Sequence, residues 1–178
     1  MSGHSKWSQI KHKKGVADAK KGVTFGKIAR AISIAARDNP DPSSNLRLKA
    51  EIERAREVNM PSENIERAIR RVVDKSASAL IEVQLELIGP GGAAIVVNAI
   101  TDNSNRTIND LKQLAVKLGG RMVGRGSVLW MFVRLPGMLT PTTIIPVTDL
   151  NERSLLDTLI KALEEHEDVQ NVFTNADS

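Results

Sequence analysis

The chain has 178 residues, of which 41% are hydrophobic and 26% charged, an ordinary globular composition that argues against disorder along its whole length. Aromatic residues make up only 3%, so we expect an aliphatic core. The absence of cysteine excludes disulfides, thiolate metal sites and a cysteine nucleophile. The sequence contains no apolar run of the ~18 residues that span a bilayer, and its amino terminus lacks a signal-peptide core. We therefore expect a cytoplasmic protein.

The net charge of +4 hides an uneven distribution along the chain. Residues 1–75 carry 17 Lys and Arg against 9 Asp and Glu, whereas residues 76–178 carry 8 against 12. Within the first 30 residues, eight basic residues accompany a single acidic one, Asp18. Such a concentration of positive charge is typical of a surface that binds a polyanion, most often nucleic acid. The alternative is a solvated basic arm that serves solubility.

Residues 1–75 predict a basic helical domain. Its first 15 residues are polar and lack a sustained period, so we expect a flexible arm there. Apolar residues at spacings of three and four predict helices from about Ala17 to Arg37, from Asn45 to Val58 and from Pro61 to about Val73. Two prolines in Asn39-Pro40-Asp41-Pro42 separate the first two helices. The residues expected to face the core are Phe25, Ile28, Ala29, Ile32, Ala36, Leu48, Ile52, Ala55, Ile65, Ala68, Ile69 and Val72.

We expect a hinge at residues 76–79 between this domain and a second one, residues 80–178. Alternation of apolar and polar residues predicts a half-buried strand over residues 81–87, with Glu82, Gln84 and Glu86 on its solvent side. A turn at 89–92 and a strand at 95–100 are expected next, followed by a helix that Asn105 or Thr107 caps and Gly119-Gly120 ends. A strand at 128–133, with Trp130 in the core, then leads into a loop at 135–148 that contains a possible strand at 144–147. The last expected elements are a helix capped by Asp149 with Glu152 and a strand at 169–174.

This order of elements predicts an α+β protein. The amino-terminal three-helix domain is followed by an α/β sandwich domain, in which helices lie on one face of a mixed or antiparallel sheet.

Few residues have the spacing that catalysis or a cofactor requires. His4 and His12 lie eight apart without a cysteine or close carboxylate to complete a metal site. The acidic run from Glu164 to Asp168 is best explained as a solvated helix end, where the imidazole of His166 suits the helix dipole. The glycine clusters at 89–92 and 124–127 are not placed between a strand and a helix, as phosphate-binding loops are. We predict no enzyme activity, no metal and no cofactor.

The candidate nucleic-acid site is the basic arm and its continuation. Lysines neutralise phosphates, and an exposed indole stacks on an unpaired base for ~1–3 kcal/mol. Trp7 has an alternative role, which is to pack the arm onto the helices. The arginines of the third helix alternatively pair along it with Glu63, Glu66 or Asp74. The candidate binding residues are His4, Lys6, Trp7, Lys11, His12, Lys13, Lys14, Lys20, Lys21, Lys27, Arg30, Arg67, Arg70 and Arg71.

The second and third helices, joined at Asn59-Met60-Pro61, have the outline of a helix-turn-helix. In that motif the first residues of the second helix meet base edges in the major groove. Here those positions include Glu63 and Glu66, whose carboxylates would repel the flanking phosphates. Major-groove recognition by this helix is therefore not expected.

Several short motifs occur in order over nearly the whole chain. They are Gly3-His4-Ser5-Lys6-Trp7 with Ile10-Lys11-His12-Lys13, Asn59-Met60-Pro61 with Asn64-Ile65-Glu66-Arg67-Ala68-Ile69, Gly89-Pro90-Gly91-Gly92, Thr101-Asp102-Asn103 with Asn105-Arg106-Thr107, Gly126-Ser127-Val128 with Trp130-Met131-Phe132, and Asp168-Val169-Gln170-Asn171-Val172. This pattern strongly resembles the YebC/PmpR family of bacterial gene-expression regulators and mitochondrial translational activators. Two features depart from the family. Only Leu135–Thr148 stands where members usually insert a third domain, and aliphatic residues replace the family's aromatics before Gly89.

The resemblance implies a non-enzymatic protein that acts on DNA or on the ribosome. A lysine-rich arm with one aromatic residue and no recognition helix suits rRNA or tRNA better than a specific operator. We therefore predict a ribosome-associated translation factor. A transcriptional regulator that binds promoter DNA is the second reading, and a protein-interaction scaffold that uses the acidic second domain is the third. No membrane partner is expected, and the oligomeric state is left open.

Overall fold

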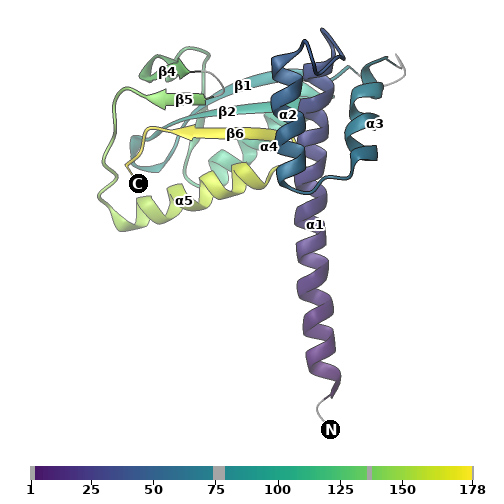
Figure 1. The fold of residues 1–178 in the computed structure, drawn as a ribbon. Helices are drawn as coiled ribbons and strands as arrows, with labels where there is room; N and C mark the ends of the chain where they lie inside the picture. The colour runs from purple at the N-terminus through teal and green to yellow at the C-terminus, as the bar shows by residue number, and fades with distance from the viewer. Residues whose placement is uncertain (1–2, 74–78, 136–137, 178) are drawn as a thin grey trace. The chain divides into compact units, whose positions relative to one another are not determined.

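The computed structural model describes residues 3–73, 79–135 and 138–177, with side chains for residues 20–71 of the first range. The chain divides into two compact units, residues 1–77 and residues 78–178 (Figure 1). Three helices form the first unit, and an antiparallel sheet with two helices forms most of the second, which confirms the predicted α+β class. Within the described ranges, no helix combines the length and the apolar character that crossing a bilayer requires.

The first unit contains α1 (Gly3–Ala36), α2 (Leu46–Glu57) and α3 (Ser62–Val73). The last two match their predicted ranges closely, but α1 begins at Gly3, well before the expected start near Ala17. The segment expected to form an irregular arm therefore has helical backbone in the structure. Lysine and alanine favour helix, no proline interrupts this stretch, and extending an existing helix needs no new nucleus.

An aliphatic core holds α2 and α3 against α1. Asn45 caps α2, because its Oδ1 accepts the N–H of Leu48 at 3.0 Å while its Nδ2 donates to the carbonyl of Ala35 at 2.7 Å. The buried hydroxyl of Ser33 donates to the carbonyl of Ala68 at 2.8 Å and so joins α1 to α3. The predicted core positions are confirmed apart from Val72, whose side chain lies outside the described residues. The buried members of this core are Ile28, Ile32, Ala35, Ala36, Leu48, Ile52, Ala55, Met60, Ile65 and Ala68.

The second unit is built on a four-stranded antiparallel sheet in the order β3-β1-β2-β6. Its strands are β1 (Ile81–Ile88), β2 (Ala94–Thr101), β3 (Arg121–Val123) and β6 (Val169–Thr174). A separate hairpin joins β4 (Phe132–Leu135) to β5 (Met138–Pro141). The helices are α4 (Ser104–Lys117) and α5 (Leu150–Glu165), with short 3-10 turns η1 (Pro90–Gly92) and η2 (Leu129–Met131).

Both faces of this sheet are covered. On one face, residues such as Leu87, Ile95 and Val97 pack with α4 and α5 in a core completed by Leu159 and Leu163. The opposite face carries a smaller core made with η2 and the hairpin, with Val96, Val128, Phe132 and Leu139 among its buried residues. Figure 1 shows α5 and the β4–β5 hairpin on opposite sides of the sheet. The predicted placement of helices on one face is therefore correct, and the hairpin is an additional layer.

The hairpin layer corrects the expectation for β1. The alternation predicted that Glu82, Gln84 and Glu86 all face solvent, but Glu86 is only 3% exposed. A clean alternation reads as one buried and one solvated face only if nothing covers the second face. Here the segment that follows β3 covers the end of β1 that carries Glu86.

Residues 121–148 differ most from expectation. The predicted strand over 128–133 is η2 followed by β4, and β3 and β5 were not predicted because strands of three and four residues show no measurable period. The possible strand at 144–147 reduces to a single bridge between Ile145 and Ala176.

The helix caps of the second unit were predicted with mixed success. α4 is capped by Asn103, whose Oδ1 accepts the N–H of Arg106 at 3.1 Å, rather than by Asn105 or Thr107. Those two residues lie inside the first turns of α4. The Asp149 cap of α5 is confirmed, because its Oδ1 accepts two backbone N–H groups at 2.9 Å.

Candidate nucleic-acid interface

One continuous helix, α1, carries most of the predicted binding residues. For the first group of these, the structure describes helical backbone, while their side chains lie outside the described residues. This group comprises His4, Lys6, Trp7, Lys11, His12, Lys13 and Lys14. The two roles considered for Trp7 therefore remain alternatives.

The second group on α1 lies where the helix enters the packed part of the unit. Lys20 and Lys21 are exposed, and Lys27 and Arg30 are half-buried. The ammonium of Lys21 lies 5.4 Å from the ring centroid of Phe25, a cation–π contact. Since Phe25 packs against the core, this contact places positive charge beside the folded part of the domain.

The basic residues of α3 are exposed on its surface. Arg70 forms an ion pair with Glu66 one turn earlier, with 2.7 Å between Nη2 and Oε2. Pairing along the helix, the alternative considered from the sequence, is thus observed for Arg70. Both side chains are more than half exposed, so the pair contributes little to stability and a phosphate competes for it readily. In the described part of the chain, the ion pairs found do not include Arg67 or Arg71, and Asp74 lies outside it.

The start of α3 is acidic in the structure, as the sequence predicts. The turn from α2 passes through Asn59, whose φ of 57° is left-handed, and the buried Met60. Glu63 and Glu66 are both exposed on the first two turns of α3. Carboxylates at this end disfavour its entry into a DNA groove between two phosphate chains.

The glycine-rich segment before β2 is a structural turn. Gly91 has a φ of +70°, and a Cβ built on it would lie 2.7 Å from Cγ1 of Val147. A Cβ on Gly89 would lie 2.9 Å from Ile95 and Leu156 side-chain atoms. The turn therefore needs glycine for its backbone conformation and for close packing, which explains the motif without a phosphate ligand.

A buried carboxylate organises the segment between β3 and β4. One oxygen of Glu86 accepts the N–H groups of Val128 and Leu129 at 2.7 and 2.9 Å, and the other accepts that of Gly126. Burial acts to raise the pKa of Glu86, but these three bonds and the charge of Arg125 together hold it below its ordinary value. Glu86 therefore stays ionised and fixes the course of the loop. This role was not predicted, because Glu86 fits the alternation of an exposed strand face.

Trp130 lies in this segment and was wrongly assigned to the core. Val128 and Phe132 are buried, but Trp130 between them is 68% exposed. The two-residue alternation fails here because η2 interrupts the extended backbone. The indole N–H donates to the carbonyl of Ser127 at 3.0 Å, which fixes the ring while leaving most of it accessible.

A buried polar network joins the start of α4 to the start of β6. The carboxylate of Asp168, fully buried, accepts bonds from the hydroxyl of Thr107 at 2.7 Å and from Arg106 at 3.0 Å. Thr107 also lies 2.9 Å from the hydroxyl of Thr101. The hydrogen bond from Arg106 to Asp168 raises the pKa of the guanidinium above its ordinary value. These residues match two of the short motifs, and the contacts account for them structurally.

The acidic helix end has no metal-site geometry. Among the side chains that the structure describes, those of residues 20–71, 79–135 and 138–177, no group of three His, Asp or Glu is placed to hold a metal ion. His166 is the C-cap of α5, and its Nδ1 accepts the backbone N–H of Asp168 at 3.2 Å. The backbone of His166 thus ends α5, while its imidazole bonds the turn that follows the helix.

Comparison with known proteins finds relatives that match most of the chain. It is 48% identical over 142 residues to a "Probable transcriptional regulatory protein" of Solibacter usitatus, and that match covers 79% of this chain but 57% of the relative. It is 41% identical over 176 residues to one so named of Dehalococcoides mccartyi, which covers 98% of this chain and 70% of the relative. The matched part of this chain thus spans 57% of the length of the first relative and 70% of the length of the second.

A solved structure and two family models match the chain as well. A crystal structure of a conserved hypothetical protein from Aquifex aeolicus, 30% identical, superposes with a TM-score of 0.84 over 97% of both chains. The family model described as "TACO1/YebC protein N-terminal domain" matches residues 5–75, and "TACO1/YebC second and third domain" matches residues 80–139. The family resemblance seen in the short motifs is confirmed: the chain belongs to the TACO1/YebC family.

Proposed function

We propose that this protein is a non-enzymatic, nucleic-acid-binding regulator of gene expression. The observation that supports it best is α1, a single helix of 34 residues whose sequence holds eight of the chain's basic residues and one acidic residue. Phosphates bind such a concentration of ammonium and guanidinium groups through counterion release. The names of the relatives, probable transcriptional regulatory proteins, point to the same broad function.

The nucleic acid that best fits these binding residues is RNA with unpaired bases. Ribosomal RNA and transfer RNA on the ribosome have such bases. Proteins that read duplex DNA specifically place a helix or ribbon in a groove with side chains that reach base edges. The acidic start of α3 is unsuited to that task, and α1 offers point charges with a single indole, Trp7. Point charges recognise phosphate positions, and an indole stacks on an unpaired base.

A DNA-binding transcriptional regulator is the second candidate. It is favoured by the names of the relatives, which describe transcription rather than translation. The two candidates differ in one measurable property, because an operator-binding protein prefers its own duplex to bulk duplex by about 10³-fold or more at physiological salt. A protein that tracks RNA shape and phosphates has no such preference among duplexes.

Deletion of residues 2–21 tests the binding role of α1. The deletion removes six lysines and one aspartate but leaves the packed portion of α1 from Phe25 onward. If four to six phosphate contacts are lost, the slope of log affinity against log salt should shrink by about 3–5, at ~0.7–0.9 per contact. A matched variant with these six lysines changed to glutamine keeps the length of the helix and should show a similar loss of slope. An unchanged slope in both variants would place the binding surface elsewhere.

A further inference from the structure

The second unit, although acidic overall, contains a long segment without any acidic residue. From Leu111 to Thr148 the sequence has five basic residues and no Asp or Glu, whereas the rest of residues 76–178 has three basic and twelve acidic residues. Two of these basic residues, Lys112 and Lys117, belong to α4, and the other three are the arginines of residues 121–134. Solubility does not explain why this stretch is only basic, because charge of either sign serves solubility.

Three arginines lie on and between the strands that border the smaller core of the second unit. Val123 packs into that core, so Arg121, two residues earlier on β3, projects from the same face of the sheet. Arg134 follows Phe132, a buried member of the same core, at the same spacing on β4. Arg125 lies in the loop between these strands. All three side chains are exposed, and the ion pairs found in the described ranges do not include them.

The exposed indole of Trp130 lies in the middle of this segment. Its N–H is already bonded to Ser127, so the ring has a fixed orientation and offers apolar faces rather than a free donor. The loop that carries it is itself fixed by Glu86 through three backbone N–H groups. An aromatic ring held in this way loses little conformational entropy when a flat group stacks on it.

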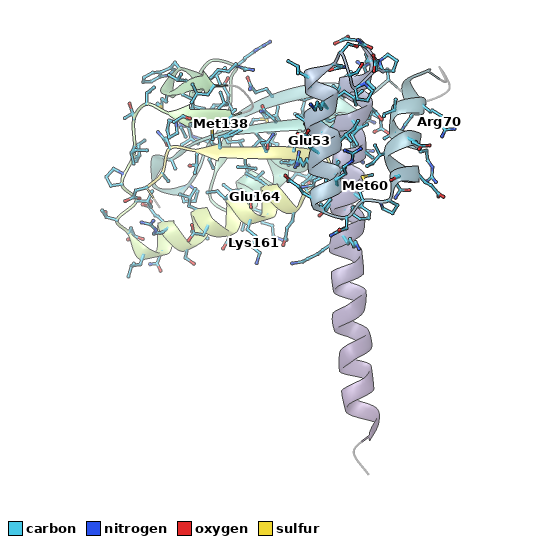
Figure 2. All side chains as sticks on the ribbon, in the orientation of Figure 1. Glu53, Met60, Arg70, Met138, Lys161 and Glu164 are labelled. Carbon is cyan, nitrogen blue, oxygen red and sulfur yellow. The ribbon has the colours of Figure 1, made fainter. Side chains whose placement is uncertain are left out.

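Apolar side chains are exposed on the outer face of the hairpin, opposite the face that carries Phe132, Arg134 and Leu139. Val133, Leu135 and Met138 are 48%, 45% and 52% exposed, and cross-strand pairing sets Leu135 opposite Met138. Figure 2 shows Met138 on the hairpin, on the other side of the sheet from Lys161 and Glu164 of α5. Because the segment lacks carboxylates, a second copy of the same surface would bring arginines against arginines. The occupant must therefore be anionic and must also present flat apolar groups.

We propose that Arg121, Arg125, Trp130 and Arg134 form a second RNA contact, at which an unpaired base stacks on Trp130 while the arginines bind the flanking phosphates. Single-stranded nucleic acid meets both requirements, since each nucleotide joins a negative phosphate to an apolar base face. The proposal rests on the proposed function and extends it: the second unit contributes its own contact, in addition to α1.

The test uses the full-length chain with Trp7→Phe, in which Trp130 is the remaining tryptophan. Titration with a twelve-nucleotide uridine RNA should quench its fluorescence, while an abasic strand of equal length and charge should quench far less. Trp130→Ala should weaken binding of the uridine strand by about 5- to 140-fold and leave the abasic strand unaffected. Arg125→Ala should weaken both strands. Val116→Ala and Lys117→Ala, exposed on α4, serve as matched controls and should change neither.

The outcomes separate this proposal from the broader one. If the chain binds the uridine strand but Trp130 is neither quenched nor required, the second contact is wrong and the role of α1 stands. A Trp130 signal that changes with protein concentration alone would show self-association through the hairpin and would also overturn the proposal. Failure of the unsubstituted chain to bind any of the strands contradicts both the second contact and the proposed function.

Discussion

Replacing Glu86 by glutamine should destabilise the second unit although the two side chains have nearly the same shape. The Glu86 carboxylate accepts three backbone N–H groups, two at one oxygen and one at the other. Glutamine has one oxygen and one NH2 group, so at least one backbone N–H must face a donor instead of an acceptor. Hydrogen bonds to a charged group contribute about 1.5–3 kcal/mol each, and the remaining bonds lose their charge assistance.

We expect Glu86→Gln to lower the free energy of unfolding of the second unit by about 2–4 kcal/mol at pH 7. Urea unfolding followed by circular dichroism measures this loss. Hydrogen exchange of the peptide spanning residues 124–131 localises it, because the amides of Gly126, Val128 and Leu129 should lose protection first. Asp157→Asn, which removes one exposed carboxylate from α5, is the control and should change stability by less than about 0.5 kcal/mol.

The effect of Glu86→Gln should also depend on pH. The pKa of Glu86 is held below its ordinary value in the folded chain, so its stabilising contribution is complete above the unfolded-chain pKa of about 4.3. As the pH falls through the folded-state pKa, the carboxyl protonates and the contribution disappears. The difference between the parent and Glu86→Gln should thus be constant from pH 6 to 8 and shrink in acid. A difference below about 0.5 kcal/mol at pH 7, or one that is the same at pH 3, would refute this reasoning.

Two further pairs of substitutions probe a turn and a helix cap of the second unit. Gly91→Ala should cost about 2–4 kcal/mol in thermal or urea unfolding, because it combines a left-handed backbone with a clash against Val147, whereas Gly92→Ala has the same backbone strain in open space and should cost only about 1–2 kcal/mol. Equal costs would mean that packing at Val147 is unimportant. Asp149→Ala should remove about 0.5–2 kcal/mol by uncapping α5, and Asp149→Asn should retain most of the cap, as unfolding of each variant will show.

The long periodic elements could be predicted from the sequence because their own residues determine them. α2 and α5 combine an apolar stripe with a capping side chain, and β1, β2 and β6 show clear apolar patterns, so their ranges were close to those observed. The glycine turn before β2 was likewise identified by residue type. In these segments local preference and tertiary packing agree.

The region around Trp130 could not be predicted because its structure depends on contacts distant in sequence. Glu86 lies 40 residues or more before the amides that it binds, and no local pattern reveals that pairing. Once that carboxylate bends the loop into η2, the alternation around Trp130 no longer describes which side chains are buried. The signal that was available in the sequence is the absence of acidic residues from Leu111 to Thr148.

The candidate site on α1 was predicted from charge and composition, and the structure adds that its residues share one helix. The helical start at Gly3 was missed because apolar periodicity detects a buried face, and a polar helix lacks one. The pairing of Arg70 with Glu66 was one of two alternatives that spacing alone leaves open.

The central claim, recognition of unpaired RNA, is tested most directly by comparing the affinity of the full chain, and of Trp7→Ala, for three ligands at physiological salt. The ligands are a ribosomal RNA fragment with unpaired loops, a random-sequence duplex DNA and a promoter duplex. The account predicts that the looped RNA is preferred, and that Trp7→Ala costs ~1–3 kcal/mol on it and little on either duplex. A promoter bound about 10³-fold more tightly than random duplex, with no effect of Trp7→Ala on RNA, would contradict the account.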